Sequence, residues 1–423
     1  MTWTRRLCGL AALAVVAAAG AGCETQPRRT GTLPGGAGGP AAGARPAGVR
    51  PNIPTKDLEA RDLDVKWTYY LAENVLQVHL VEDLLFLFTD KKNLWAVEVD
   101  SGFVTWMYHI GEDLSYPPAM YSYKRDGIPR TDELFLIAKD TLHVVDPAPK
   151  RGFLLWKKRL PFAAASAPAA SISHVYIGSW DHRVYAIDKA SQAIDWSYRT
   201  QAPVVAPVEP AEKTVEAVFA GSEDGRIYAF SPVREDLKWA VETDAGIVSR
   251  PLFFKNFLYV GSKDMSVYCI ATINGSLDWE FPTGAPVTQT PVAYTGDTVY
   301  VMSDDNFLYS VNRQPTDPKK KYEVRWQYPR GRKVLAKGRE TIYVLAGDDP
   351  ATRDIDEERS LVAIEEKTGK VLWRHPFSKD VDFFVTNPFS PTSLVEKDKR
   401  LASTIILTYR DGWMIALKEK APF

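Results

Sequence analysis

The sequence predicts an all-β protein, an eight-bladed β-propeller with four antiparallel strands in each blade. The first observation is a repeat of about 44 residues, a period typical of solenoids and propellers. It is marked by eight tryptophans: Trp67, Trp106, Trp156, Trp196, Trp239, Trp279, Trp326 and Trp373. The second observation is a small residue ten positions before five of these tryptophans, inside a short apolar stretch. These small residues are Ala96, Ala186, Ala229, Cys269 and Ala363.

The third observation is the strand pattern inside one repeat. Residues 215–220 and 226–230 are rich in β-branched and aromatic residues and flank the polar hairpin 222–225. Residues 237–241 alternate between apolar and polar and predict a third strand, and residues 247–254 predict a fourth. Four short strands per repeat, with almost no helical periodicity, favour a propeller blade.

An aspartate recurs in the predicted hairpins, as Asp181, Asp224, Asp264 and Asp305. Asp suits such turns because its carboxylate accepts hydrogen bonds from nearby backbone N–H groups. We therefore interpret these aspartates as structural, with a catalytic role as the alternative.

The two ends of the predicted domain, residues 56–423, fit each other. The last apolar strand, residues 414–417, has no tryptophan strand after it, and the strand around Trp67 has no blade before it. We predict that the N-terminal strand completes the last blade and closes the ring, which leaves the ring without an open end.

The unit from Ala363 to Trp373 carries a small residue, an apolar residue, an acidic residue, then Thr368-Gly369 and the terminal tryptophan. This pattern resembles the PQQ-like, or quinoprotein-type, β-propeller repeat. The resemblance implies that the eight tryptophans dock between neighbouring blades. It does not decide function, because enzymes and scaffolds share these blades.

The N-terminus predicts export. Two arginines precede an apolar run over residues 7–19, and a small-residue cleavage region leads to Cys23, so residues 1–22 are interpreted as a signal peptide. Cys23 resembles the lipidated cysteine of bacterial lipoproteins, although Gly20 stands where that family prefers an aliphatic residue. Cleavage after Ala21, giving a soluble periplasmic protein, is the alternative. Residues 23–55 are rich in Gly, Pro, Ala and Arg and predict a flexible, lipid-anchored tether. Glu24 after the cysteine favours the outer membrane.

No catalytic, cofactor-binding or metal-binding residue is predicted. After loss of the signal peptide and with Cys23 as anchor, Cys269 is the remaining cysteine, and its repeat position predicts a small buried residue. Adjacent cysteines, which the resemblance leads one to expect in PQQ-dependent dehydrogenases, do not occur. The six histidines lack metal-ligand spacing. Residues 354–358 are acidic, and we favour a solvated loop over a calcium site.

Composition excludes two further classes. The net charge of −1 gives no electrostatic footprint for nucleic acid. No apolar stretch approaches the length of a membrane-spanning helix.

Four insertions interrupt the repeat, and we expect partners to bind there because loops on a rigid scaffold carry function. They are residues 121–133, 313–323, 346–360 and 387–400.

The resemblance to non-catalytic lipoproteins of this propeller family implies a periplasm-facing scaffold in outer-membrane protein assembly. Its expected partners are the assembly complex and unfolded outer-membrane proteins, with the lipid anchor in the outer membrane. Two alternatives stay open: a PQQ-dependent dehydrogenase-like quinoprotein, and a periplasmic sensor propeller that binds a small ligand or polysaccharide.

Overall fold

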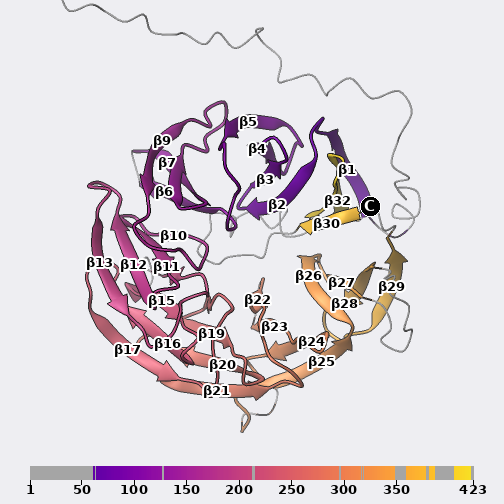
Figure 1. Ribbon diagram of the computed structural model, residues 1–423. Helices are drawn as coiled ribbons and strands as arrows, with labels where there is room; N and C mark the ends of the chain where they lie inside the picture. The colour runs from indigo at the N-terminus through magenta and orange to yellow at the C-terminus, as the bar shows by residue number, and fades with distance from the viewer. Residues whose placement is uncertain are drawn as a thin grey trace, which may run out of the picture. The chain divides into compact units, whose positions relative to one another are not determined.

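Eight antiparallel sheets of four strands follow one another around a ring in the described part of the chain (Figure 1). The computed structural model describes residues 61, 63–125, 128–211, 215–294, 297–315, 317, 319–347, 359–377, 381–385 and 404–420. The predicted eight-bladed propeller is confirmed. The predicted signal peptide and tether, residues 1–22 and 23–55, lie outside the described residues.

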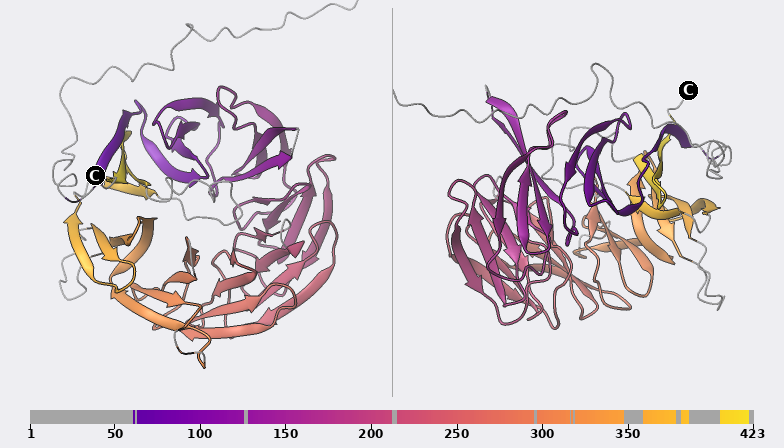
Figure 2. Two further views of the ribbon diagram at one scale, coloured as in Figure 1. Left: turned by 180° about the vertical axis from the view of Figure 1, so that it is seen from behind. Right: turned by 45° about the horizontal axis from the view of Figure 1, so that its top comes forward.

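Blades 1 to 7 are each made of four consecutive strands, ordered from the inside of the ring to its outside (Figures 1 and 2). Blades 1 to 4 contain β2 (Val75–Val81), β3 (Leu84–Thr89), β4 (Asn93–Glu98), β5 (Val104–His109); β6 (Ala119–Arg125), β7 (Ile128–Ala138), β8 (Thr141–Val145), β9 (Leu154–Arg159); β10 (Ala169–Ala170), β11 (His174–Gly178), β12 (Arg183–Asp188), β13 (Ile194–Arg199); and β14 (Glu209–Pro210), β15 (Val218–Gly221), β16 (Arg226–Phe230), β17 (Leu237–Glu242). Blades 5 to 7 contain β18 (Leu252–Phe254), β19 (Phe257–Gly261), β20 (Ser266–Ala271), β21 (Leu277–Pro282); β22 (Val292–Ala293), β23 (Thr298–Met302), β24 (Phe307–Asn312), β25 (Glu323–Pro329); and β26 (Gly331–Lys337), β27 (Thr341–Ala346), β28 (Ser360–Glu365), β29 (Val371–Pro376).

Blade 8 joins the two ends of the domain. It consists of β30 (Val381–Val385), β31 (Thr404–Tyr409), β32 (Trp413–Glu419) and, as its outer strand, β1 (Leu63–Tyr70). β1 pairs with β32 in antiparallel register from Leu63 opposite Glu419 to Tyr70 opposite Trp413. The predicted closure of the ring by the N-terminal strand is therefore confirmed.

Two predicted strands are shorter than expected. The strand predicted over 215–220 begins at Val218, because the Val215 N–H donates to the Ala211 carbonyl in a turn. The strand predicted over 247–254 is confined to Leu252–Phe254. Ile247 instead seals the seam between blades 4 and 5: its N–H donates to the Ser222 carbonyl at 2.9 Å, and its side chain lies against Gly221.

The connections alternate between the two faces of the ring, as they must in a four-stranded meander. We call the face with the hairpins between second and third strands, and with the links between blades, the hairpin face. The opposite face carries the connections between first and second and between third and fourth strands, and we call it the turn face. By this rule the described parts of the insertions 121–133 and 313–323 lie on the turn face, while most of 346–360 and all of 387–400 lie outside the described residues.

The tryptophans on the outer strands reach the next blade. In four seams of the described chain the indole N–H donates to a backbone carbonyl of the next blade. The acceptor residue lies just after the third strand of that blade, three positions beyond the small residue of the repeat or the residue that replaces it. The pairs are Trp67 with Val99 O (2.8 Å), Trp106 with Pro147 O (2.9 Å), Trp239 with Thr272 O (3.0 Å) and Trp326 with Glu366 O (2.7 Å). At the Trp196 seam the corresponding Pro232 carbonyl accepts from the Tyr176 hydroxyl instead, at 2.6 Å.

A glycine lies under the indole ring in these same four seams. Gly102 has a φ of +73°, and a Cβ on it would lie 2.5 Å from Cδ2 of Trp67. Gly152, Gly275 and Gly369 have the same left-handed backbone and the same contact with their tryptophans. Only glycine allows both the backbone conformation and the approach of the ring.

The buried apolar residues form clusters that extend across the seams. Trp106, Trp196 and Trp279 lie inside clusters that each contain residues of two neighbouring blades. Trp67, Trp156, Trp239, Trp326 and Trp373 pack in or against such clusters as well. The core of the ring is thus a series of layers between blades.

We expect Gly102→Ala to destabilise the seam that holds β1 to blade 1. The substitution places a Cβ against the Trp67 ring, and the backbone strain of about 1 kcal/mol is added to a packing cost of about 1–3 kcal/mol. The matched control is Gly111→Ala: this glycine has a φ of +84° but its nearest neighbour atom would be 3.8 Å away. Equal shifts in the urea midpoint for the two variants would contradict the packing role of Gly102.

Candidate functional site

The recurring hairpin aspartates are bound within the scaffold. Asp224 accepts hydrogen bonds from the Arg226 N–H (2.9 Å), the Tyr228 hydroxyl (2.8 Å) and the Gln201 N–H of the preceding link (2.9 Å). Asp264 makes the same three kinds of bond one blade further on. These bonds are those of a structural turn residue that also fastens one blade to the next.

A serine in each hairpin completes this network on the hairpin face. Its hydroxyl donates to an alanine carbonyl in the link from the preceding blade. The pairs are Ser179 with Ala163 (2.8 Å), Ser222 with Ala202 (3.1 Å), Ser262 with Ala245 (3.1 Å) and Ser303 with Ala285 (2.9 Å). The hairpins are therefore rigid supports for the side chains at their tips.

One hairpin presents an aromatic side chain. Trp180 lies between Ser179 and Asp181 and is 54% exposed, and the repeat-equivalent positions in neighbouring hairpins hold Glu223 and Lys263. Sequence analysis did not predict a binding role for Trp180. The sequence signal for Trp180 is that a tryptophan occupies a hairpin position where the neighbouring repeats have the charged residues Glu223 and Lys263.

Three further aromatic residues, Phe162, Tyr185 and Tyr116, pack in or against one hydrophobic cluster, and together with Trp180 we call them the aromatic cluster. Phe162 stacks on Tyr185 with ring centroids 3.8 Å apart and planes 1° from parallel. The Tyr116 hydroxyl interacts with the Trp180 side chain and donates to the Ala164 carbonyl at 2.7 Å. The cluster is a firm, partly exposed platform on the hairpin face between blades 2 and 3.

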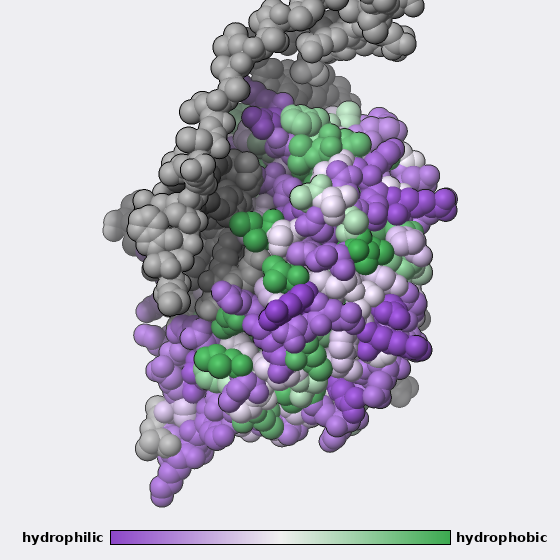
Figure 3. All heavy atoms as spheres, turned by 90° about the vertical axis from the view of Figure 1, so that its left-hand side faces the viewer, coloured by the Kyte–Doolittle hydropathy of each residue, from purple (hydrophilic) through white to green (hydrophobic). Residues whose placement is uncertain are grey.

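Apolar surface elsewhere on this side of the ring is divided. Figure 3 views the side on which β9 and β13 lie and shows separate apolar patches among hydrophilic atoms. Several exposed apolar residues sit at the start of outer strands, among them Leu154, Leu237 and Leu277. These strands pair on one side only, so each presents a free sheet edge.

Two pairs of ionisable residues lie on or beside inner strands. Glu209, 4% exposed at its side chain, accepts from the Arg250 guanidinium of the next blade at 2.6 Å. Burial raises the pKa of the Glu209 carboxyl, against the effect of Arg250. Burial also lowers the pKa of His79 to about 4, with a further contribution from the charge of Lys333. Burial lowers the pKa of Lys333 itself.

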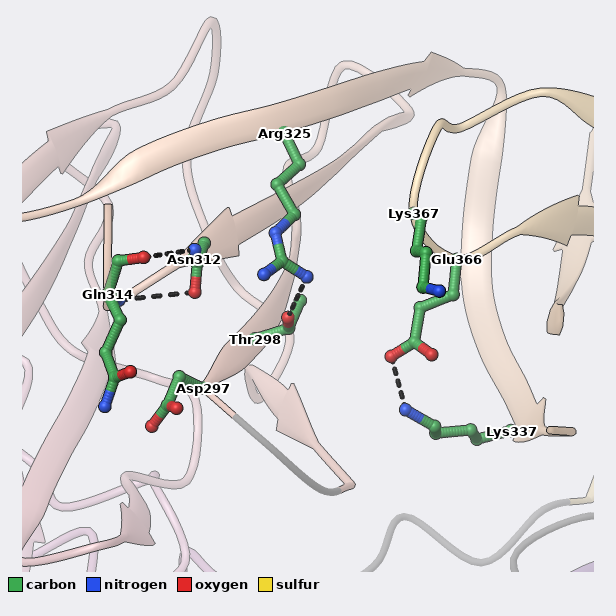
Figure 4. A pocket seen from close by; sticks show the side chains of 8 residues that line it. All are labelled: Asp297, Thr298, Asn312, Gln314, Arg325, Lys337, Glu366 and Lys367. Carbon is green, nitrogen blue, oxygen red and sulfur yellow. Dashed lines mark hydrogen bonds and ion pairs between the residues drawn. The ribbon is translucent and has the colours of Figure 1, made fainter. Parts of the chain in front are cut away.

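A polar pocket of about 300 Å³ lies between blades 6 and 7 on the turn face (Figure 4). It is lined by Asp297, Thr298, Asn312, Gln314, Arg325, Lys337, Glu366 and Lys367. Asn312 and Gln314 stand where the predicted insertion 313–323 leaves β24, so this insertion contributes a wall of the pocket. The lining residues come from two blades and from sequence positions up to 70 apart, and no sequence motif predicted the pocket.

The remaining sequence predictions concern cysteines and metals. Cys269 is fully buried, and burial raises the pKa of its thiol to about 12, as suits a core residue. Among the described residues, no group of three or more His, Cys, Asp or Glu side chains could hold a metal ion. Cys23 and the acidic residues 354–358 lie outside the described part of the chain.

The insertion predicted over 121–133 is largely paired rather than a loop. β6 and β7 continue their antiparallel pairing through Tyr121 opposite Glu133 and Tyr123 opposite Thr131. Lys189 of the next blade binds this hairpin through Glu133 at 2.6 Å and lies over the Tyr121 ring.

The described residues contain no helix that would span a membrane.

Eight four-stranded blades, joined in four seams by tryptophans that dock on glycine turns, define a PQQ-like β-propeller. The model of the family described as outer membrane protein assembly factor BamB matches residues 138–252 and 223–381, which together span more than half of the chain. The chain belongs to this family. No curated protein is matched by the sequence.

Solved structures with the same fold include a BamB protein, a designed protein and an alcohol dehydrogenase. BamB from Moraxella catarrhalis superposes with a TM-score of 0.61 at 14% identity, covering 84% of this chain and 99% of that chain. The computationally designed Ika8 protein gives a TM-score of 0.56 at 14% identity, covering 82% and 97%. Quinohemoprotein alcohol dehydrogenase ADHIIG from Pseudomonas putida HK5 gives 0.56 at 11% identity, covering 86% and 77%. At these identities the likeness is one of fold.

The lowered pKa of His79 predicts a loss of stability in acid. Its folded-state pKa of about 4 lies below the ordinary 6.5, so the unfolded chain takes up the proton first as the pH falls. The free energy of unfolding should drop by about 2 kcal/mol between about pH 6.5 and pH 4 through this residue.

The measurement is urea unfolding across that pH range. His79→Gln should remove this share of the acid loss, and Lys333→Gln should reduce it by raising the pKa of His79. An unchanged pH profile in His79→Gln would show that His79 is not responsible.

Proposed function

We propose that the protein is a non-catalytic scaffold of outer-membrane protein assembly that binds partner proteins on the periplasmic face of the outer membrane. The observation that carries the proposal is the family match over residues 138–381. The structural likeness to BamB from Moraxella catarrhalis, which covers 99% of that chain, supports it at the level of the fold.

The aromatic cluster on the hairpin face is the surface we assign to the principal partner. Trp180 is partly exposed on a hairpin that is fixed by hydrogen bonds, and tryptophan is enriched among residues that dominate interface energies. The serine and aspartate bonds of the hairpin keep Trp180 in place before a partner arrives. The free edges of the outer strands offer a second mode, since an unfolded client can add a strand there through backbone hydrogen bonds.

The chemistry of the chain supports a binding role over catalysis. The sequence has no adjacent cysteines of the kind expected in PQQ-dependent dehydrogenases. The hairpin aspartates are engaged by backbone and tyrosine donors. Turnover of alcohols or sugars by the purified protein with added PQQ and Ca²⁺ would overturn this part of the proposal.

Co-purification from detergent extracts tests the partner assignment. The tagged full-length protein should recover an outer-membrane assembly complex, and Trp180→Ala should lower the recovery by at least about tenfold, as expected for a hot-spot residue. Ile172→Ala is the matched control: Ile172 is 52% exposed in the same blade but on the turn face. Recovery of unrelated proteins only would reject the scaffold role, and equal loss in the two variants would reject the aromatic cluster as the docking surface.

Lipidation of Cys23 is part of the proposal and has its own test. Radiolabelled palmitate should be incorporated into the wild-type protein and not into Cys23→Ala, which should leave the membrane fraction. Labelling that survives the substitution would exclude Cys23 as the anchor, and an unlabelled wild type would favour the soluble periplasmic alternative.

A further inference from the structure

The pocket between blades 6 and 7 is a modified docking seam. Glu366 supplies the carbonyl that accepts the Trp326 indole N–H at 2.7 Å, and its side chain lines the pocket (Figure 4). In three other seams the residue that supplies this carbonyl is Val99, Pro147 or Thr272. This seam alone among those four places a carboxylate beside the docked tryptophan.

Each carboxylate of the pocket is already in an ion pair with a lysine. Asp297 accepts from Lys255 at 2.8 Å. Glu366 pairs with Lys337, and the Tyr300 hydroxyl donates to it at 3.2 Å. These two acids therefore leave the remaining pocket cations available to a ligand.

Arg325 is the available cation with the best geometry. It is the extra residue of a β-bulge, since Val324 pairs with Val311 and Trp326 pairs with Ser310. Bulges re-aim side chains, and this one directs the guanidinium into the pocket (Figure 4). Within the described chain its side chain makes one hydrogen bond, from Nη1 to Oγ1 of Thr298 at 3.1 Å. Since a guanidinium has five N–H donors, most of its donors face the pocket unbound.

Further positive charge surrounds Arg325. Lys367 lines the same pocket, and its ion pair with Glu340 spans 3.9 Å between side chains that are both 78% exposed, which is a weak contact. The insertion 313–323, which supplies Gln314 to the pocket wall, also carries the exposed Lys319 and Lys320. An anionic group approaching the pocket is therefore met by cations on two sides.

We propose that this pocket binds a carboxylate from an acidic segment of a partner protein, with Arg325 as the main binding residue. The planar fork of arginine matches a carboxylate in two parallel hydrogen bonds. Asp297 and Glu366 in the walls favour a singly charged carboxylate over a doubly charged phosphate, because repulsion grows with the charge of the ligand. The inference rests on the proposed partner-binding function and assigns it a second contact, on the turn face.

Fluorescence anisotropy of a fluorescein-labelled hexaglutamate peptide tests the site directly on the purified full-length protein. We expect binding at low ionic strength that Arg325→Gln weakens by at least about tenfold, the loss typical for one charged hydrogen bond. The matched control is Lys238→Gln, because Lys238 is the bulge residue at the same repeat position in blade 4, where it donates to the Glu216 carbonyl. Equal affinity in Arg325→Gln and the wild type would overturn the proposal.

Competition identifies the ligand class. Acetate should displace the peptide more effectively than inorganic phosphate at equal ionic strength, and a hexalysine peptide should not bind. Stronger displacement by phosphate would overturn the carboxylate assignment. Because the assay needs no assembly complex, its failure is distinct from a failure to co-purify one: peptide binding without co-purification would contradict the proposed function and leave the pocket chemistry intact.

Discussion

The contact of a tryptophan ring with a left-handed glycine turn in the next blade is the constraint on which the ring depends. At the seam between blades 8 and 1 the Trp67 indole N–H donates to the Val99 carbonyl at 2.8 Å, and the indole ring packs against Gly102. In the seams of Trp67, Trp106, Trp239 and Trp326, the outer strand belongs to one blade by backbone hydrogen bonds and contacts the next blade through its tryptophan. The hairpin network then needs only to hold the opposite face together, and the side chains at the tips of hairpins and turns are left free for binding.

Much of the fold could be predicted because each repeat is marked by a large residue, tryptophan, and in five repeats also by a small residue ten positions earlier. The tryptophan spacing and the unpaired strand around Trp67 together required eight blades and a closed ring. The strand limits were less predictable. Residues 247–254 have the composition of a strand, yet Ile247 is used in the seam against Gly221, and such a choice depends on the neighbouring blade. We predicted an inserted loop over residues 121–133, but these residues pair with one another and lengthen the hairpin of β6 and β7.

The candidate sites were harder to predict because neither is a local motif. The polar pocket combines residues of two blades, and Arg325 enters it through a bulge that the sequence does not reveal. The predicted insertion 313–323 contributes Gln314 to the pocket, and its role in partner binding stays a prediction. Trp180 could have been found by comparing hairpins, since it replaces charged residues of the sister repeats.

The placement of β1 in the last blade has a consequence for how the chain comes to fold. β1 is the first described strand and its partner β32 is the last. The strand pairing with the longest sequence separation is therefore the one that completes blade 8. Contacts of such separation form late, since the loop between them must first be closed. We expect the other blades to form from consecutive strands, while β1 stays unpaired until β32 has been synthesised. Closure of the ring therefore requires β32, and a product truncated before this strand leaves β1 unpaired and accessible to proteases.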